Sequence, residues 1–396
     1  MASLTSSTDV TDSLVSILSD LIGIRSDYPP GDTGPICSYA EARLTTAGYQ
    51  VQNFQKVSPI QNLVAKIGDG APSVVFNVHV DTVGPGSIDK WLGDPFQAEV
   101  SGGRIRGLGA ANCKSSMAVH LWLAEEISRR GGIKRGSLCF SFVGDEEALG
   151  PNGTKILRDQ RIIGPSILIV GAPTSNDLLI DERGVMWIRV TAYGKGGHAG
   201  DPDSADNAID RLVRLLSLLD RRVFTKLGNR KQDGIASTCN VGKISGGHNT
   251  NVVPDEATAE IDRRLLPNES VEQALEEIEN ALSSSGEPAE SYRVELILGT
   301  DGFKGRSDGQ GVTAFKEAIQ QTQQREPSFL APIGAFDGRH FSNDGIEIIN
   351  VGPGNSGEGH TVNESVMIDE LLDAAVIHLD AVDRLLDIQN YKKIEH

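Results

Sequence analysis

The sequence predicts an α/β fold, with a mixed and mostly parallel sheet flanked by helices, that is interrupted by an inserted α+β unit. Over residues 1–185, short apolar runs alternate with segments of helical apolar spacing, which is typical of strands and helices that alternate around a sheet. Between residues 186 and 298 the pattern changes to strands of alternating polarity. The first pattern returns over residues 299–396. We therefore expect one domain in two parts, 1–185 and 299–396, with an inserted domain at 186–298.

The composition is that of a globular protein, and 396 residues suggest two domains. No window approaches the roughly 18 apolar residues of a membrane span. The formal net charge of -17 argues against nucleic acid as a partner, because nucleic-acid binders need a basic surface. The first seven residues lack the basic and apolar regions of a secretory signal, so we expect a cytoplasmic protein. Four cysteines without paired spacing indicate reduced thiols: Cys37, Cys113, Cys139 and Cys239.

Apolar spacing predicts the individual elements. Residues 9–23 and 39–47 have helical spacing on either side of the turn Pro29-Pro30-Gly31. Later helices are predicted at 116–130, 205–219, 270–283, 312–323 and 368–388. Continuous apolar runs, which suit buried parallel strands, predict strands at 62–67, 74–78, 138–143, 167–170 and 347–351. In the inserted unit, strands are predicted at 186–193, 236–244 and 257–265.

A histidine and a carboxylate, His79 and Asp81, lie at the end of the apolar run 74–78. Ligands collect beyond the carboxyl ends of parallel strands, where the sheet opens into a crevice. A carboxylate beside a histidine fixes the tautomer of the ring and leaves the other nitrogen free for a cation. Taken alone, this pair is more consistent with a histidine capped in a turn.

Four more clusters fall at predicted strand ends or loops. Residues 144–147, Gly-Asp-Glu-Glu, follow the strand at 138–143, and residues 171–174 follow the strand at 167–170. Residues 352–354 follow a strand and lead to His360, and residues 107–114 open a helix. Neighbouring glutamates on a loop are often only a solvated acidic turn. The order of all five clusters along the chain is what carries information.

That order resembles the dinuclear zinc family of aminoacylases, acetylornithine deacetylases, succinyl-diaminopimelate desuccinylases, carboxypeptidase G and related exopeptidases. The resemblance runs over nearly the whole chain, from His79-Val80-Asp81-Thr82-Val83 to the segment 359–364, Gly-His-Thr-Val-Asn-Glu. It includes Trp91 and Asp94-Pro95-Phe96 between the first two clusters. The resemblance implies a zinc exopeptidase-like fold with an inserted dimerisation, or lid, domain.

The resemblance also implies a pair of zinc ions about 3.5–4 Å apart, which hold one water and polarise one carbonyl. His79 would bind one ion and be oriented by Asp81. Glu147 and His360 would bind the other ion. Glu146 would be the general base that takes a proton from the water and passes it to the leaving nitrogen.

Four further residues match positions that contact the substrate in this family. His198, in the segment 196–200, resembles a histidine that reaches the partner subunit's site to stabilise the oxyanion, which implies a homodimer. Asn251 and Arg264 match positions that hold the polar groups and the carboxylate of the substrate. Arg339 is a weaker match, because a structural ion pair explains it equally well. The remaining histidines match no ligand position: His120, His248, His340 and His378.

The chain departs from the family pattern at two metal-ligand positions. Asn112 stands where the family has an aspartate that bridges both metals, and Ala172 stands where it has a glutamate or aspartate ligand. An amide is neutral and cannot offset two dications, and alanine offers no donor. We therefore expect zero or one zinc here, against two in the family. Leu108 and the pair Ser115-Ser116 also differ, where the family has arginine and two glycines.

Two interpretations of these changes remain open. In the first, the chain is an amidohydrolase or deacylase for an N-acyl amino acid or a small peptide-like amide, with a metal site inactivated by substitution. In the second, it is a natural, metal-independent relative that uses Glu146, Asp81 and His79 for isomerisation, cyclisation or condensation, or that only binds its ligand. Cys113, a soft ligand beside Asn112, is a less favoured replacement for the lost donors.

Overall fold

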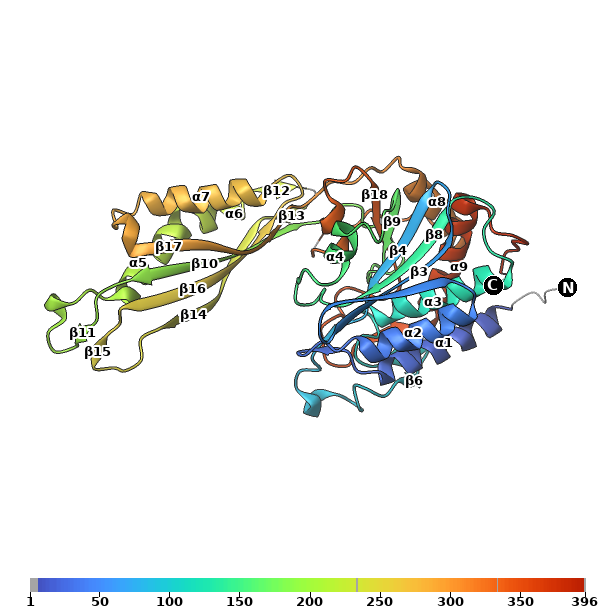
Figure 1. Cartoon of the computed structure of the whole chain (residues 1–396), viewed down its shortest axis with the longest axis horizontal. Helices are drawn as coiled ribbons and strands as arrows, with labels where there is room; N and C mark the ends of the chain where they lie inside the picture. The colour runs from blue at the N-terminus through green and yellow to red at the C-terminus, as the bar shows by residue number, and fades with distance from the viewer. Residues whose placement is uncertain (1–5, 233, 333, 395–396) are drawn as a thin grey trace. The chain divides into compact units, whose positions relative to one another are not determined.

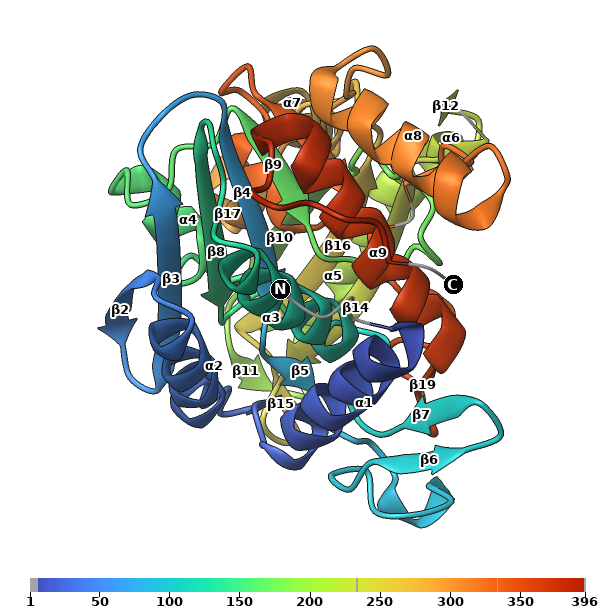
Figure 2. The same cartoon turned by 90° about the vertical axis from the view of Figure 1, so that its right-hand side faces the viewer.

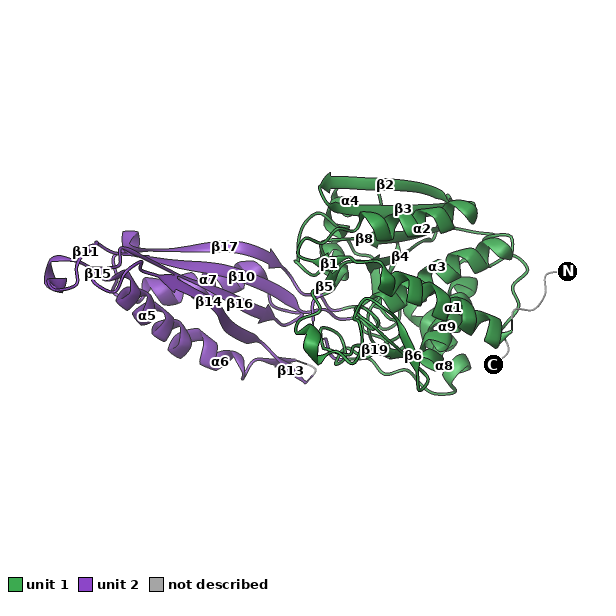
Figure 3. Cartoon of the chain, turned by 90° about the horizontal axis from the view of Figure 1, so that it is seen from below, with its two compact units in different colours: residues 1–180, 305–330, 336–396 green, residues 181–304, 331–335 purple. Residues whose placement is uncertain are grey.

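The computed structural model describes residues 6–232, 234–332 and 334–394. The chain divides into two compact units (Figure 3). Unit 1 comprises Met1–Ile180, Gly305–Leu330 and Phe336–His396, and unit 2 comprises Asp181–Lys304 and Ala331–Ala335. The inserted domain predicted at 186–298 lies inside unit 2. Unit 2 begins a few residues earlier and ends a few residues later, and it also includes the short segment Ala331–Ala335.

Unit 1 is built on a six-stranded sheet of order β18-β9-β4-β8-β3-β2 (Figures 1 and 2). The strands β18, β9, β4 and β8 run parallel to one another, and β3 is antiparallel to both of its neighbours, β8 and β2. The sheet is therefore mixed and mostly parallel. Its strands are β2 (Gln50–Val57), β3 (Ile60–Gly68), β4 (Ser73–His79), β8 (Ser137–Val143), β9 (Ile167–Val170) and β18 (Glu347–Asn350).

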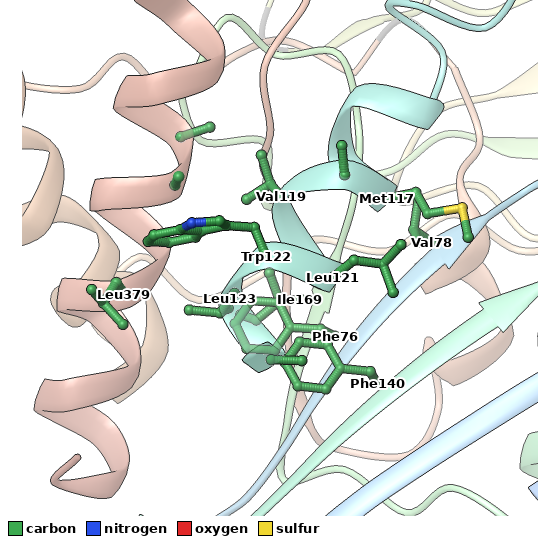
Figure 4. Packing of buried hydrophobic residues seen from close by; sticks show 14 of the residues in the cluster. Phe76, Val78, Met117, Val119, Leu121, Trp122, Leu123, Phe140, Ile169 and Leu379 are labelled. Atoms are coloured by element: carbon green, nitrogen blue, oxygen red, sulfur yellow. The ribbon is translucent and has the colours of Figure 1, made fainter. Parts of the chain in front are cut away.

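Helices cover this sheet because each presents an apolar stripe to it or to a helix already packed there. Figure 2 shows α1, α2, α3 and α9 over one face. The helix α3 is buried along almost its whole length; its Leu121 lies on the side of the sheet, and its Trp122 points toward the helix that carries Leu379 (Figure 4). The helices of unit 1 are α1 (Ser7–Gly23), α2 (Gly34–Thr46), α3 (Lys114–Arg129), α4 (Thr154–Asp159), α8 (Gln310–Gln323) and α9 (Ile368–Leu386).

Two small sheets surround the end of β4. The strands β1 (Asp27–Tyr28) and β5 (Thr82–Val83) pair in parallel and anchor the residues that follow His79. A three-stranded sheet is formed by β6 (Glu99–Ser101), β7 (Arg104–Arg106) and β19 (Ser365–Met367). The second sheet ties the segment after His360 to the loop that precedes α3.

Unit 2 is an antiparallel sheet of order β14-β16-β10-β17 with helices packed on one face. Every second residue of β16, from Ala257 to Leu265, is buried against these helices, and the residues between them are half-buried. This alternation is the period of a strand with one covered face. The elements are β10 (Gly184–Tyr193), β14 (Thr238–Gly246), β16 (Glu256–Leu265), β17 (Tyr292–Thr300), α5 (Ala208–Leu219) and α7 (Val271–Ser283), with the short β11 (Gly197–His198) and β15 (Val252–Val253).

The α/β fold with an inserted antiparallel α+β unit is confirmed, and the predicted helices and strands lie within a few residues of the observed ones. The strands β2 and β17 and the helix α4 were not predicted. β2 and β17 are largely exposed strands that lack a continuous apolar run, and α4 has only six residues. All four cysteines are free thiols. Within the described residues, no helix combines the length and the hydropathy of a membrane span.

Candidate active site

The predicted site residues of unit 1 gather at one edge of its sheet. His79 is the last residue of β4 and is the register partner of Val143, the last residue of β8. The strand β9 is parallel to β4 and ends two residues before Ala172. Parallel strands bring their carboxyl ends to the same edge, which is where ligands bind in such sheets. His79, the glutamates after β8 and Ala172 therefore share this edge.

His79 is oriented by Asp81 in two ways. Its Nδ1 donates to the backbone oxygen of Asp81 at 2.9 Å and lies 3.6 Å from the carboxylate Oδ1. The other carboxylate oxygen, Oδ2, accepts the backbone N–H of Glu147 at 3.0 Å. The backbone carbonyl is thus the closer contact, and the carboxylate links His79 to the loop after β8. Nε2 is left to face the site.

The electrostatic surroundings of His79 favour its charged form. Burial alone would lower the pKa of this histidine, but Cys113, Glu146 and Asp81 outweigh burial and raise the pKa well above its usual value. His79, Glu146 and Glu147 each offer a ligand atom, and these three atoms lie within 4.8 Å of one another. Two carboxylates and one imidazole are thus concentrated in a small, buried space.

Glu146 is the acid–base candidate of the two glutamates because its surroundings favour its protonated form. Burial, together with the charge of Glu147, raises the pKa of Glu146 to about 7, against the opposing effects of His79 and Arg339. Arg339 Nη1 lies 3.6 Å from Glu146 Oε1, and both side chains are nearly inaccessible to solvent. A carboxyl group with a pKa near neutrality can both take and give a proton at physiological pH.

Asn112, Glu147 and His360 form a closed triangle of polar atoms. Asn112 Nδ2 donates to Glu147 Oε1 at 3.0 Å and lies 2.9 Å from His360 Nε2. His360 Nε2 is itself 2.9 Å from Glu147 Oε1. The contact with Glu147 raises the pKa of His360. The hydrogen-bearing side of the Asn112 amide is therefore turned toward the two groups that resemble ligands of the second ion.

Glu364 positions the loop that carries Asn112. This carboxylate, which is almost fully buried, accepts the backbone N–H groups of Gly109 at 3.0 Å, Ala111 at 2.9 Å and Asn112 at 2.7 Å. Gly109 has a φ of +79°, a conformation that favours glycine, and this lets the loop turn back toward the carboxylate. Sequence reasoning assigned no role to Glu364. Its place in the same motif as His360 was the available signal.

Asp337 positions Arg339 through a buried network that the sequence does not reveal. Its Oδ2 accepts hydrogen bonds from Asn77 Nδ2 at 3.0 Å and from Thr154 Oγ1 at 2.7 Å. Ser141 donates to the other end of the Asn77 amide at 2.6 Å. The network joins β4, β8 and α4 to the short helix Asp337–Phe341. Its partners lie 64 to 260 residues apart, so no local pattern could predict it.

Cys113 directly follows the altered position Asn112 in the sequence. It is the N-cap residue of α3, is 1% exposed, and its Sγ donates to Asn112 Oδ1 at 2.8 Å. Burial raises the pKa of the Cys113 thiol, and His79 acts against this rise. The thiol thus contacts Asn112, whose amide in turn contacts Glu147 and His360.

The donor set of this chain does not fit a pair of zinc ions. A hydrogen-bearing amide nitrogen has no lone pair for a cation, and Asn112 turns this nitrogen toward Glu147 and His360. The amide oxygen is engaged by Cys113. Ala172 is buried and offers no donor. Each zinc needs about three or four protein donors, and two ions sharing this edge would lack them.

The remaining predicted site residues belong to unit 2. His198 and Asn251 are neighbours there: β11 pairs with β15, and the N–H of Ala199 donates to the oxygen of Asn251 at 3.0 Å. Arg264 lies on β16, where its guanidinium binds Asp262 at 2.8 and 3.0 Å. Trp187 donates to the same carboxylate at 2.6 Å.

The histidines without an assigned role are not part of this cluster. His120 and His378 are buried in helices and pack against each other with ring centroids 5.8 Å apart. His248 is exposed in unit 2, and His340 follows Arg339 in the short helix.

Comparison with known proteins agrees with the family resemblance. A family model described as a peptidase dimerisation domain matches residues 180–290. The succinyl-diaminopimelate desuccinylase of Nitrosococcus oceani is 31% identical over 338 residues, which cover 83% of this chain and 88% of that protein. The enzyme of the same name from Hahella chejuensis is 28% identical over 394 residues, covering 95% and 99% of the two chains.

Solved structures share the fold over nearly the whole chain. An M20 family metallo-carboxypeptidase from Sulfolobus solfataricus superposes with a TM-score of 0.78 at 17% identity, covering 94% of this chain and 99% of its own. The YXEP protein of Bacillus subtilis, described as a dinuclear metal binding peptidase, superposes with a TM-score of 0.69 at 15% identity, covering 96% and 99%. With its desuccinylase relative and its site at the carboxyl edge of the same fold, the chain belongs to the M20 metallopeptidase family, a family of hydrolytic enzymes.

Proposed function

We propose that this protein cleaves the amide bond of an N-acyl amino acid or a small peptide-like amide, at a site that holds zero or one zinc ion instead of a pair. The observation that carries the proposal is the convergence of His79, Glu146 and Glu147 within 4.8 Å beside an amide that replaces a bridging carboxylate. The acid–base side chains of an amidase are retained, while the bridging carboxylate and the carboxylate ligand at position 172 are replaced by Asn112 and Ala172.

Glu146 is the proton carrier in this proposal. It is buried, its pKa is near 7, and it is not held in a short ion pair, so it can take a proton from the attacking group and deliver it to the leaving nitrogen. Arg339, 3.6 Å away, keeps part of the carboxyl population ionised and is also placed to contact a substrate carboxylate. Asn251 and Arg264 of unit 2 are proposed to bind the polar groups of the substrate, and His198 to act on the partner's oxyanion.

The test combines metal analysis with a substrate panel. Purified protein, untreated or chelated, would be incubated with N-acetyl and N-succinyl amino acids and with dipeptides, and the amine and acid products measured by mass spectrometry. We expect cleavage of at least one class, at most one zinc per chain, and loss of activity in Glu146→Gln. The matched control is Glu125→Gln, a carboxylate on α3 that pairs with Arg43. Two zinc ions per chain would contradict the proposed metal content, and full activity of Glu146→Gln would remove Glu146 from the mechanism.

A second function, non-hydrolytic acid–base chemistry such as isomerisation, cyclisation or condensation, is favoured by the pKa of Glu146 near 7. A group half-protonated at neutral pH suits the shuttling of one proton between two positions of a substrate. Conversion of a substrate by metal-free protein without release of an amine and an acid would establish this function in place of hydrolysis.

We also propose that the protein is a homodimer formed through unit 2. The family model that matches residues 180–290 is a dimerisation domain, and β14 is an edge strand with the exposed apolar residue Ile244. The sheet and helices of unit 2 are held by their own core, which contains none of the proposed ligands. Light scattering should give the same dimer mass before and after chelation. Dissociation by the chelator would contradict a metal-independent interface.

A further inference from the structure

We propose that the helix-covered face of unit 2 binds a second copy of this chain about a two-fold axis, through a row of cations and a row of glutamates on that face. The inference is independent of the proposed amide cleavage. It adds a second contact to the proposed homodimer, whose β14 edge belongs to the sheet and not to the helices. Two dimers joined in this way form a tetramer, the smallest closed particle that has both contacts.

The first observation is a concentration of positive charge in a strongly acidic protein. The chain has a formal net charge of -17, yet residues 221–231 contain five arginines and lysines and no acidic residue. Arg230 is bound by Glu269 and Glu277. Three of the other cations lie on one helical segment, are exposed, and have no ion-pair partner among the described residues. We call them the basic row: Arg221, Arg222 and Lys226.

The local structure keeps the basic row on the outside of unit 2. The row lies on a π-helical turn, Asp220–Phe224, and on the short helix α6 (Thr225–Leu227), which together continue α5. Val223 and Leu227 of this segment are buried in the core of unit 2. They lie four residues apart, on one side of the segment, and fix it to the core. The basic row occupies other positions of the segment, so its charges face solvent.

The second observation is an acidic row on the neighbouring helix α7. Its members are exposed, have no ion-pair partner in the part of the chain that the structure describes, and lie at i, i+4 and i+7, which places them on one stripe of the helix. The acidic row consists of Glu272, Glu276 and Glu279. In contrast, Glu277 of the same helix is bound by Arg230 and Arg263. The helix α7 packs against α5 and the π-helical turn, so both rows lie on the same face of unit 2 (Figure 1).

Half-buried apolar side chains accompany the two rows. Leu216 of α5, Phe224 of the π-helical turn and Leu275 of α7 pack against the core of unit 2 but remain partly accessible. Protein interfaces combine an apolar centre with a polar and charged rim. In such an interface the apolar contacts supply most of the affinity, and the charges select the partner and its orientation. This face offers both components.

The occupant that fits this face is a second copy of the chain. A two-fold axis perpendicular to the face places the basic row of each copy on the acidic row of the other, which is an isologous and self-complementary contact. Nucleic acid or an anionic membrane would meet the acidic row beside the basic row, as well as the net charge of -17. Both repel a polyanion. The charge pattern therefore favours self-association.

The first experiment measures the mass of the full-length protein by light scattering at low and high salt. We expect particles of four 42.3 kDa chains at low salt. At about 0.5 M NaCl we expect two chains, because a Debye length of roughly 4 Å screens the attraction between the rows. Arg221→Glu combined with Arg222→Glu should give two chains at either salt. The matched control is Lys56→Glu combined with Arg306→Glu, two exposed cations of unit 1, which changes the net charge equally and should keep the mass of the parent.

The second experiment restores the charge complementarity between two variants. Glu276→Arg combined with Glu279→Arg should also give particles of two chains. An equimolar mixture of this variant with the Arg221→Glu, Arg222→Glu variant should regain four chains. In the mixture, the face of one partner is wholly basic and that of the other is wholly acidic, so the two attract each other. Circular dichroism of each variant confirms that the exposed substitutions leave the fold intact.

The outcomes separate this contact from the proposed β14 dimer. A parent mass of two chains that neither salt nor the reversal of Arg221 and Arg222 alters would overturn the helix-face contact and leave the β14 dimer standing. A mixture that stays at two chains would also overturn it, because the charges would then not hold the face. If the reversal gives single chains, the helix face is the dimer contact and the β14 edge is not.

Discussion

The side-chain nitrogen of Asn112 donates to Oε1 of Glu147 at 3.0 Å. In an M20 enzyme with an aspartate at this position, two carboxylates would face each other here and would require a cation between them. The amide removes one negative charge and supplies a hydrogen bond in its place. In the enzyme with an aspartate, metal binding would relieve the repulsion between the two carboxylates. In this chain, metal binding would instead have to break the hydrogen bond between Asn112 and Glu147.

Restoring both lost carboxylates should restore metal binding. We expect Asn112→Asp combined with Ala172→Glu to raise the zinc content toward two ions per chain. The site would then hold three carboxylates that can bind metal directly, instead of Glu147 alone. Elemental analysis after dialysis against zinc measures the occupancy, with Asn240→Asp on β14 as a control for an added charge elsewhere. An unchanged zinc content would mean that these two positions do not lie at the metal site.

Removing the charge of Glu146 should stabilise the protein at high pH. Burial raises the folded-state pKa of this carboxyl group from 4.5 to about 7, so the folded state binds a proton that the unfolded state releases between these values. The cost of the buried charge therefore appears as pH rises through this window and is complete above it. We expect Glu146→Gln to be more stable than the parent at pH 8, by roughly 1–3 kcal/mol, and equally stable near pH 4.5. Thermal unfolding at several pH values measures the difference, and a gain that is independent of pH would contradict the assignment.

Glu364 should contribute much more to stability than a carboxylate in a surface ion pair. Glu364→Ala removes the acceptor of three backbone N–H groups of the loop that carries Asn112, and we expect a loss of about 2–4 kcal/mol in denaturant unfolding. The matched control is Glu358→Ala, whose carboxylate is 36% exposed and binds Arg104. It should cost about 1 kcal/mol or less. Equal losses in the two variants would show that the loop does not depend on Glu364.

His120 should make the protein sensitive to acid. Burial lowers the pKa of this histidine well below its usual value, with His378 adding to the effect, and neither ring nitrogen of His120 has a partner among the described residues. In the unfolded state His120 therefore binds a proton that it does not bind in the folded state. The stability of the folded state falls as pH drops below about 6.5. We expect His120→Leu to be at least as stable at pH 7 and to lose less stability at pH 5, as followed by circular dichroism. The exposed His248→Leu should change neither value, and an unaltered pH dependence in His120→Leu would contradict this role.

The order of the elements was predictable from the sequence because the burial of a strand or helix produces a local pattern of apolar residues. The run 74–78 is apolar except for Asn77 since β4 is covered on both faces, and the residues of β16 alternate because one face of its sheet is covered by helices. The strand β2 shows no such pattern: it is an edge strand paired with β3, and most of its side chains are exposed. The same reasoning placed His79, Glu146 and Ala172 at one edge, because parallel strands end together.

What the sequence by itself determined is which chemical groups are present: the two glutamates, the histidines, and an amide and a methyl group where the M20 family resemblance implies carboxylates. What only the tertiary structure decided is how those groups pair. The amide of Asn112 turns its nitrogen to Glu147, which lies 35 residues further along the chain, and its oxygen to Cys113. Hydrogen-bond direction and contact depend on distances of about 3 Å. Residue spacing along a chain cannot set such distances between separate elements, and only the packing of α3 against the sheet does so.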